Sequence, residues 1–331
     1  MRVALLDDYQ GVALQSADWS SLPAEVAVEA FHDHLTDEMT LAARLEPFDV
    51  VMALRERTRF PRSLLVRLPN LKLLTTAGMR NAAIDVAAAT ELGILVCGTS
   101  GSSRATMELT WGLILALLRN IPREHQATRE GRWQETVGIG LEGKTLGIVG
   151  LGNIGGQVAE VARAFHMRLI AWSQNLTEER AAACGAECVD KEDLLSRADI
   201  VTIHLQLSPR TTGLIGAQDL ARMRPAAYLI NTSRGPIVEE PALVEALRRG
   251  LIAGAGLDVF DEEPLPPGHP LLTLANVVLT PHLGYVTAEA YRGFYGQTLE
   301  NVRDLVAGTP QRVLNPEVLP LRRMPLVRSR T

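Results

Sequence analysis

Arg234, Glu263 and His282 are three side chains of this 331-residue chain that together suit one reaction. A carbonyl that accepts a hydride becomes an oxyanion, which needs a proton and a positively charged partner. A histidine can supply the proton because its pKa lies near neutrality, and a carboxylate beside the ring stabilises its protonated form. A guanidinium can bind a substrate carboxylate and polarise the carbonyl. These residue types predict the reduction of a 2-keto acid.

Each of the three side chains also has a simpler interpretation. His282 follows a proline and can cap a helix, and Glu263 is one of four acids between residues 258 and 263. Arg234 can pair with a neighbouring acid. Because each residue follows an apolar segment within a polar cluster, the joint arrangement favours the catalytic interpretation.

A glycine-rich turn near the middle of the chain predicts a dinucleotide site. The spacing G-x-G-x-x-G occurs at Gly150, Gly152 and Gly155, between a predicted strand and a predicted helix. Gly150 allows the tight turn, Gly152 lets the backbone approach a pyrophosphate, and Gly155 lets the helix pack close to the strand. The N–H groups of the new helix, which includes Asn153 and Ile154, can bind the phosphates.

The elements that must position these residues are short apolar strands that alternate with helical patterns, as in parallel α/β folds. Strands are predicted at residues 3–6, 50–54, 71–75, 94–96, 146–149, 168–172, 187–189, 200–203, 228–230, 254–257 and 277–279. Helices are predicted near residues 38–48, 84–91, 102–120, 154–165, 240–249 and 288–306. Open parallel sheets build their ligand sites at the carboxyl ends of the strands, where the polar clusters of this sequence begin.

The chain is long enough for two domains, because single cores stop growing near ~250–300 residues. Residues 102–120 are apolar on several faces and predict a buried helix, which can be an interdomain spine, a dimer surface or both. We expect a substrate domain from residues 1–100 and 285–331, and a dinucleotide-binding domain from residues 101–284. The expected fold class is α/β, with a Rossmann-type doubly wound parallel sheet in the second domain and a smaller flavodoxin-like fold in the first.

Composition narrows the classes of protein that fit. The net charge of −5 does not favour a nucleic-acid surface, and the short basic tail at 322–330 predicts a solvated chain end. No apolar run reaches the ~18–20 residues of a membrane span, and the acidic N-terminus is unlike a signal peptide. We therefore predict a cytoplasmic protein without a membrane segment. No disulfide framework or metal site is predicted from the three cysteines, Cys97, Cys184 and Cys188.

Five motifs occur in the order found in one enzyme family. The chain resembles the D-isomer-specific 2-hydroxyacid dehydrogenases, the family of phosphoglycerate dehydrogenase, glyoxylate/hydroxypyruvate reductase and D-lactate dehydrogenase, over nearly its whole length. The motifs are Gly150-x-Gly-x-x-Gly155, His204-x-x-x-Ser-Pro, Asn231-Thr-Ser-Arg-Gly235, Asp258-x-Phe-x-x-Glu-Pro264 and Pro281-His-x-Gly284.

The resemblance implies roles for individual residues. It makes His282 the proton donor and acceptor, Glu263 its partner, and Arg234 a substrate-binding residue. Beyond the glycine-rich turn with Asn153 and Ile154, the predicted cofactor contacts are Ser173, His204, Leu205, Thr232, Ser233, Asp258 and Gly284. The predicted substrate contacts are Arg55, Gly78, Met79 and Arg80. Members of the family are usually homodimers, so we expect a homodimer that buries residues 102–120.

The sequence departs from the family pattern at three positions. Ser173 stands where an Asp or Glu usually binds the adenine ribose and repels a 2′-phosphate, so NAD is only slightly favoured and NADP stays open. Gln206 replaces a usual proline. Arg80 replaces the second glycine of a Gly-x-Gly loop, and either adds positive charge for a polar or anionic substrate or simply faces outward.

Two other functions compete with the dehydrogenase. One is an NAD(H)-sensing scaffold of the corepressor type, which keeps this fold and acts through protein partners with little turnover. The other is a formate dehydrogenase-like activity, which Glu263 disfavours because that branch is expected to have a neutral glutamine beside its histidine. The identity of the 2-hydroxy acid is not fixed by the sequence.

Overall fold

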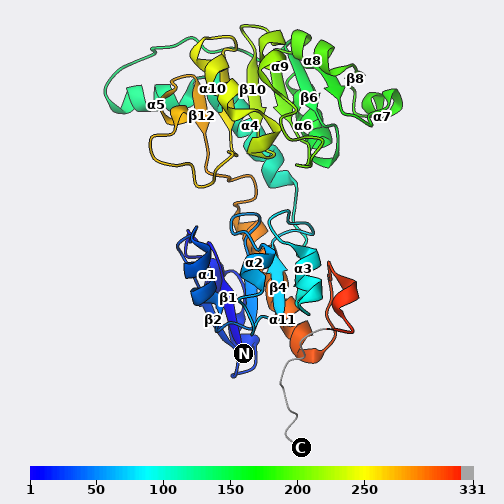
Figure 1. Cartoon of the computed structure of the whole chain (residues 1–331). Helices are drawn as coiled ribbons and strands as arrows, with labels where there is room; N and C mark the ends of the chain where they lie inside the picture. The colour runs from blue at the N-terminus through cyan, green and yellow to red at the C-terminus, as the bar shows by residue number, and fades with distance from the viewer. Residues whose placement is uncertain (322–331) are drawn as a thin grey trace, which may run out of the picture. The chain divides into compact units, whose positions relative to one another are not determined.

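The computed structural model describes residues 1–321, so the predicted solvated tail at 322–330 lies outside the described residues. The chain forms two compact units (Figure 1). Unit 1 comprises Met1–Ser102 and the segment that begins at Thr287, and unit 2 comprises the continuous segment Ser103–Val286. The assignment of unit 1 to substrate and unit 2 to cofactor stays a prediction.

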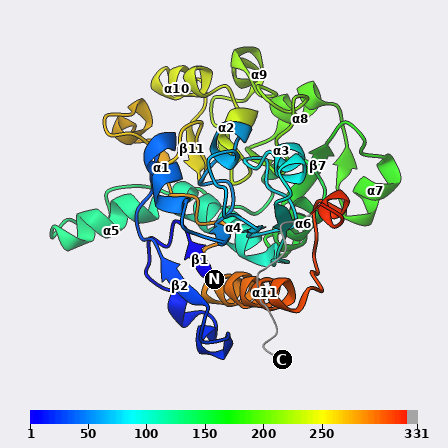
Figure 2. The same ribbon diagram turned by 60° about the horizontal axis from the view of Figure 1, so that its bottom comes forward.

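Unit 1 contains a five-stranded parallel sheet with the order β2-β1-β3-β4-β5, which is the flavodoxin-like order. Its strands are β1 (Arg2–Leu5), β2 (Ala27–Ala30), β3 (Val50–Ala53), β4 (Leu73–Thr76) and β5 (Leu95–Cys97). Its helices are α1 (Glu38–Leu45), α2 (Arg62–Leu65), α3 (Val86–Glu91) and α11 (Ala288–Ala307). Helix α11, which is labelled in Figure 2, brings the chain back to this unit, and it packs against β4.

Unit 2 contains a seven-stranded parallel sheet with the order β12-β11-β10-β9-β6-β7-β8. Its strands are β6 (Thr145–Val149), β7 (Arg168–Trp172), β8 (Glu187–Cys188), β9 (Ile200–Ile203), β10 (Tyr228–Asn231), β11 (Gly254–Leu257) and β12 (Val277–Leu279). Its helices are α4 (Arg104–Leu118), α5 (Ile121–Arg129), α6 (Asn153–Ala164), α7 (Glu178–Ala183), α8 (Lys191–Arg197), α9 (Ala217–Arg222) and α10 (Glu240–Arg248). The predicted α/β class and the doubly wound parallel sheet are therefore confirmed.

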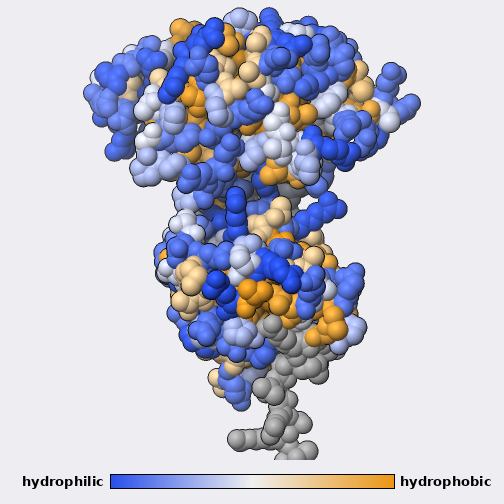
Figure 3. All heavy atoms as spheres, viewed as in Figure 1, coloured by the Kyte–Doolittle hydropathy of each residue, from blue (hydrophilic) through white to orange (hydrophobic). Residues whose placement is uncertain are grey.

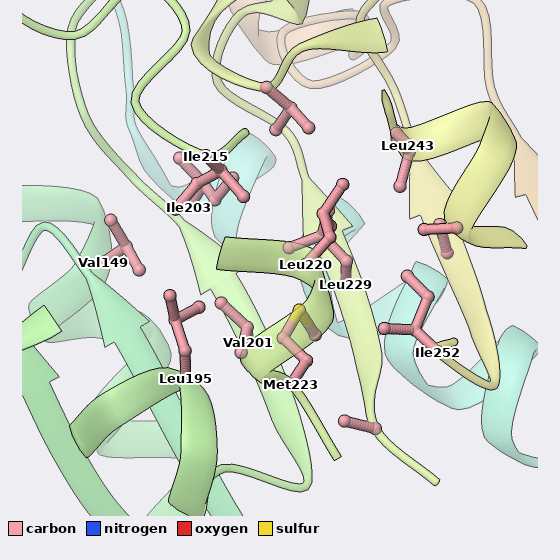
Figure 4. Packing of buried hydrophobic residues seen from close by; sticks show 14 of the residues in the cluster. Val149, Leu195, Val201, Ile203, Ile215, Leu220, Met223, Leu229, Leu243 and Ile252 are labelled. Atoms are coloured by element: carbon pink, nitrogen blue, oxygen red, sulfur yellow. The ribbon is translucent and has the colours of Figure 1, made fainter. Parts of the chain in front are cut away.

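Alternate residues of the strands in unit 2 point to opposite faces of the sheet and belong to two separate apolar clusters. On β9, Val201 and Ile203 belong to one cluster and Ile200 to the other. The first cluster includes α8, α9 and α10 side chains such as Leu195 and Leu220 (Figure 4). The second holds α4 against α6 and the strands. Burial on both faces explains why the central strands of this sheet are mostly apolar, as is usual in parallel sheets.

Helix ends follow local chemistry that the sequence displays. The side chain of Asp37 accepts a hydrogen bond from the Thr40 N–H at the start of α1, and α10 is followed by Gly250 with φ 65°. Strand β2 was not predicted, because it is an edge strand with half-exposed residues and no apolar run. The short helices α7, α8 and α9 were not predicted either.

The surfaces of both units, on the face in Figure 3, carry mainly hydrophilic residues with scattered hydrophobic ones. Within residues 1–321, no helix is long and apolar enough to cross a membrane. In the same residues, no group of three or more His, Cys, Asp or Glu side chains can hold a metal ion.

Candidate active site

His282 and Glu263 lie side by side beyond the carboxyl ends of β12 and β11. The Nδ1 atom of His282 is 2.5 Å from Oε2 of Glu263, and the N–H of Phe260 donates to Oε1 of Glu263 at 3.0 Å. An ionised carboxylate can only accept hydrogen bonds, so we assign the proton of the contact to Nδ1. That leaves Nε2 of His282 for a substrate oxygen. The side chains of His282 and Glu263 are 12% and 26% exposed.

The backbone holds His282 in an uncommon conformation. Its φ is 54°, in the left-handed region, and its N–H donates to the Asp258 carbonyl at 2.8 Å. A histidine stays in this region only where the surrounding structure compensates, which occurs often at functional sites. The conformation therefore fixes the direction in which the imidazole leaves the backbone.

Asp258 is a buried carboxylate that joins the loops after β11 and β12. Its Oδ1 accepts from the Thr280 hydroxyl at 2.6 Å and from the Leu283 N–H at 2.7 Å, and its Oδ2 accepts from the Gly284 N–H at 2.9 Å. Burial raises the pKa of Asp258, while these hydrogen bonds and the nearby His282 oppose the rise. Asp258 therefore fixes the segment that carries His282.

Arg234 follows β10, the strand beside β11 in the sheet. The side chain of Asn231 holds this turn, because its Nδ2 donates to the Arg234 carbonyl at 2.9 Å and its Oδ1 accepts from the Ser233 N–H at 3.0 Å. At Gly235, a Cβ atom would lie 2.1 Å from the carbonyl carbon of Phe260. Only glycine allows this approach, which packs the Arg234 turn against the loop that carries Glu263.

The glycine-rich turn at the start of α6 fits a dinucleotide. A Cβ on Gly155 would lie 2.2 Å from the Gly150 carbonyl oxygen, and Gly150 itself has φ 101° and contacts the His204 backbone. A Cβ on Gly152 would meet nothing within 4 Å. Two glycines are thus required by packing, whereas the third faces open space beside the N–H groups of the first turn of α6, where a pyrophosphate can bind.

His204 stands at the carboxyl end of β9 as a neutral imidazole. Burial lowers its pKa to about 3. Its Nε2 contacts the Thr202 hydroxyl at 2.9 Å, and its Nδ1 is buried without a hydrogen-bond partner among residues 1–321. A buried imidazole nitrogen of this kind is consistent with a place beside a bound ligand.

In unit 1, the predicted substrate residues gather at the carboxyl ends of β3 and β4. The Arg55 guanidinium donates to the Ala77 carbonyl at 3.2 Å and occupies the space where a Cβ on Gly78 would be. Gly78, with φ 97°, donates its own N–H to the Thr99 hydroxyl at 3.0 Å. That N–H is therefore engaged within the protein. Met79 and Arg80 are both exposed.

Comparisons with known proteins identify the family. The sequence profile described as the NAD binding domain of D-isomer specific 2-hydroxyacid dehydrogenases matches residues 111–284. The chain is 43% identical to glyoxylate reductase of Aeropyrum pernix over 270 residues, which are 78% of this chain and 81% of that protein. The chain belongs to the D-isomer-specific 2-hydroxyacid dehydrogenase family.

Two further members of the 2-hydroxyacid dehydrogenase family agree. D-3-phosphoglycerate dehydrogenase of Methanocaldococcus jannaschii is 42% identical over 262 residues, which are 78% of this chain and 50% of that protein. The chain thus spans about half the length of that relative. A crystal structure of phosphoglycerate oxidoreductase from Vibrio cholerae superposes with a TM-score of 0.88 and 36% identity, covering 93% of this chain and 99% of the other. Because the matching profile is that of an NAD binding domain, the cofactor is a nicotinamide dinucleotide.

The side-chain hydroxyls of two predicted cofactor residues form hydrogen bonds within the protein. The Thr232 hydroxyl meets the Thr110 hydroxyl of α4 at 2.9 Å, and the Ser233 hydroxyl donates to the Ile203 carbonyl at 2.8 Å. Asn153 donates to the Ser103 hydroxyl at 3.0 Å. Leu205 packs against the first apolar cluster of unit 2. Any contact of these four with the cofactor stays a prediction.

Ser173 comes directly after β7, at the position that the sequence predicts for the adenine ribose. Its carbonyl accepts from the Leu176 N–H at 3.0 Å, and the side chain is partly exposed. The turn therefore offers a hydroxyl where an acid would repel a 2′-phosphate, and the choice between NAD and NADP stays a prediction.

The sequence does not predict the roles of two residues that organise the candidate site. Asn231 was quoted only as part of a motif, although its amide holds the Arg234 turn. Thr280 directly precedes Pro281 and His282, and its contact with Asp258 was not foreseen. Both are short polar residues at the carboxyl end of a strand, and that position is the sequence signal of their role.

Proposed function

We propose that this protein is an NAD(P)-dependent dehydrogenase that interconverts a small 2-keto acid and a D-2-hydroxy acid. The observation that supports the proposal most is the contact of His282 with Glu263 beside the Asp258 network, on the loops that follow adjacent strands of a dinucleotide-binding sheet. A bound nicotinamide supplies or accepts the hydride at C2 of the substrate. The protein side chains handle the proton and the charge.

In the reducing direction, His282 begins protonated on both nitrogens. Its Nε2 gives a proton to the substrate oxygen as that oxygen gains negative charge, and its Nδ1 keeps the contact with Glu263. In the oxidising direction, neutral His282 takes the hydroxyl proton at Nε2. Glu263 stabilises the protonated ring in both directions.

Arg234 is proposed to bind the substrate carboxylate and to polarise the C2 carbonyl. Arg234 lies in the turn after β10, and β10 is the neighbour of β11, the strand that leads to Glu263. The contacts of Asn231 and Gly235 support this role because they fix the backbone at Arg234. A guanidinium can direct its N–H groups at a substrate only if the backbone that carries it is held in place.

Arg55, Gly78 and Met79 stay predicted substrate contacts in unit 1. Arg80 is exposed, and we propose that its charge favours substrates with a second polar or anionic group. The test is the KM of Arg80→Ala for small and for dicarboxylic keto acids. A raised KM for the dicarboxylic acids alone supports the proposal, whereas equal KM values in both proteins point to an outward-facing arginine.

We propose a slight preference for NAD over NADP, because no arginine directly follows Ser173 to bind the 2′-phosphate of NADP. The named relatives are dehydrogenases and reductases, which favours turnover over the alternative of an NAD(H)-sensing scaffold. The family resemblance supports a homodimer, and the cytoplasmic location predicted from the sequence stays a prediction.

The experiment that tests the proposed function uses the wild-type protein in both directions. We expect oxidation of NADH with at least one of glyoxylate, hydroxypyruvate, pyruvate and oxaloacetate, and reduction of NAD by the D but not the L enantiomer of a chiral product. Because the two directions need opposite protonation states of one imidazole, raising the pH should slow reduction and speed oxidation. Turnover of the L enantiomer alone, or equal pH trends, would overturn the assignment.

A further inference from the structure

A second group of ionisable side chains lies next to the loop that carries Glu263, and none of the proposed steps uses it. Glu240 is in the first turn of α10, and His269 begins a short 3-10 helix, Pro270–Thr273. The Nε2 atom of His269 is 2.9 Å from Oε1 of Glu240, and the N–H of Asp261 donates to Oε2 of Glu240 at 3.3 Å. The side chains of His269 and Glu240 are only 15% and 18% exposed.

The hydrogen bonds define which nitrogen of His269 is a donor. The Leu271 N–H donates to Nδ1 of His269 at 3.3 Å, so Nδ1 is an acceptor and carries no proton. The proton of the neutral ring is therefore on Nε2, which donates to Glu240. Because Leu271 belongs to the first apolar cluster of unit 2, His269 is anchored to the core on one side and holds Glu240 on the other.

Glu240 in turn fixes a peptide group beside the catalytic pair. The N–H that it accepts belongs to Asp261, and the preceding N–H, of Phe260, donates to Glu263. Two consecutive N–H groups thus bind two carboxylates, and one of these carboxylates contacts His282. The same stretch packs against Gly235, where a Cβ would lie 2.6 Å from the Asp261 nitrogen.

The hydrogen bonds of His269 support a structural connection and not a cation site. Burial and the neighbouring Glu240 carboxylate raise the pKa of Asp261, and His269 opposes the rise. Both nitrogens of His269 are already engaged, one as an acceptor and one as a donor. Within residues 1–321, no group of three or more such side chains is arranged to hold a metal ion.

We propose that Glu240 and His269 are positioning residues for the 2-hydroxyacid dehydrogenase reaction. They hold the loop 258–264 so that the Glu263 carboxylate meets Nδ1 of His282. This role rests on the proposed function, because it concerns the orientation of the same proton-transfer pair. A small displacement of a general acid costs large factors in rate, so Glu240 and His269 affect kcat through the position of Glu263.

Two substitutions of His269 separate this role from a merely structural one. His269→Asn keeps a side-chain acceptor for the Leu271 N–H, as a good helix cap does, but is too short to reach Glu240. His269→Gln keeps an N–H donor at about the reach of Nε2 but is a poor cap. Glu240→Gln removes the charge that both donors bind, and Glu245→Gln, an exposed acid on the same helix, is the matched control.

We expect His269→Asn and Glu240→Gln to lower kcat between about 10- and 100-fold. The KM for the keto acid and the Kd for NADH should stay within about twofold, as the positioning role requires. His269→Gln should keep most of the wild-type kcat despite a lower Tm, and Glu245→Gln should match the wild type. Wild-type kcat in His269→Asn, or kcat losses that simply follow Tm across the variants, would overturn the inference.

An NMR measurement tests the positioning role of Glu240 and His269 without relying on turnover of any substrate. The proton between His282 Nδ1 and Glu263 should give a downfield NMR signal, assigned by its absence in His282→Gln. The positioning role predicts that this signal shifts or broadens in His269→Asn and is unchanged in Glu245→Gln, whether or not any keto acid is turned over. An unchanged signal in His269→Asn would overturn the inference and leave the proposed function untouched.

Discussion

His282 shows how one residue can be recognised from sequence while its surroundings are not. Its type, and its place after an apolar strand, predict a proton carrier, and the structure puts its Nδ1 2.5 Å from Glu263. The supporting contacts of Glu240 and His269 escape prediction because these residues are 29 positions apart and meet only through the path of a loop. Sequence spacing carries no signal for such a contact.

Glu263→Gln tests the partner of the proton carrier at the residue scale. Glutamine keeps the size of the side chain but not its charge, so the protonated imidazole loses stabilisation. We expect kcat for keto acid reduction at pH 7 to fall about 10- to 100-fold, a part of the ~10²–10⁴ that general acid–base catalysis contributes. The control is Glu262→Gln, the exposed neighbouring acid. Equal losses in both variants would contradict a specific role for Glu263.

The lowered pKa of His204 predicts that the folded protein loses stability as the pH falls. Its pKa is about 3 in the folded protein, so below its ordinary pKa near ~6.5 the unfolded chain binds a proton that the folded chain does not. Folding stability from this group is therefore complete above pH 6.5 and is lost as the pH falls toward 3.

The comparison with His204→Gln isolates that effect. From pH 6.5 downward, the wild type should lose stability relative to the variant by about 1.4 kcal/mol for each pH unit. Urea unfolding at pH 7.5, 5.5 and 4.5 measures the difference. If the two proteins lose stability in parallel over this range, His204 is not held neutral by the fold.

At the scale of elements, several buried strands could be predicted to the residue, whereas edge strand β2 and three short helices could not. Strands β7, β9 and β11 begin and end at the predicted residues, because burial on both faces demands a continuous apolar run between polar breaks. Edge strand β2 and the short helices α7 to α9 lack such runs. Helices α7 and α8 instead begin at local caps, Thr177 and Asp190, whose side chains accept backbone hydrogen bonds.

The start of α6 offers a test with a built-in control. A methyl group on Gly155 would lie 2.2 Å from the Gly150 carbonyl oxygen, whereas a methyl group on Gly156 would have its nearest contact at 3.9 Å, with the Cys184 sulfur. We expect Gly155→Ala to lower Tm and to weaken NADH binding more than about tenfold, because the helix must move off the strand.

Gly156→Ala should bind NADH like the wild type and be as stable or up to about 1 kcal/mol more stable, since alanine favours a helix interior. Fluorescence titration with NADH and thermal unfolding compare the two variants. Indistinguishable binding by Gly155→Ala and Gly156→Ala would show that the turn does not hold the dinucleotide as proposed.

At the scale of the whole molecule, each unit has an apolar core of its own. The cluster around Phe48 and Leu65 lies entirely in unit 1, and the two clusters of unit 2 draw only on residues between 103 and 286. Two domains could be predicted because the chain is too long for one core and because the resemblance fixed their order. The substrate and the choice between NAD and NADP could not, since they depend on a few side chains whose surroundings a linear sequence does not display.

The most direct test of the account is the rate of NADH oxidation by the whole protein with a 2-keto acid that the wild type reduces, compared with His282→Ala. The matched control is His125→Ala, an exposed histidine on α5. We predict that His282→Ala loses at least about 100-fold in kcat, as removal of a general acid does, while its Kd for NADH and its Tm stay near wild type and His125→Ala is fully active. Reduction by His282→Ala at the wild-type rate would contradict the central claim that His282 carries the proton.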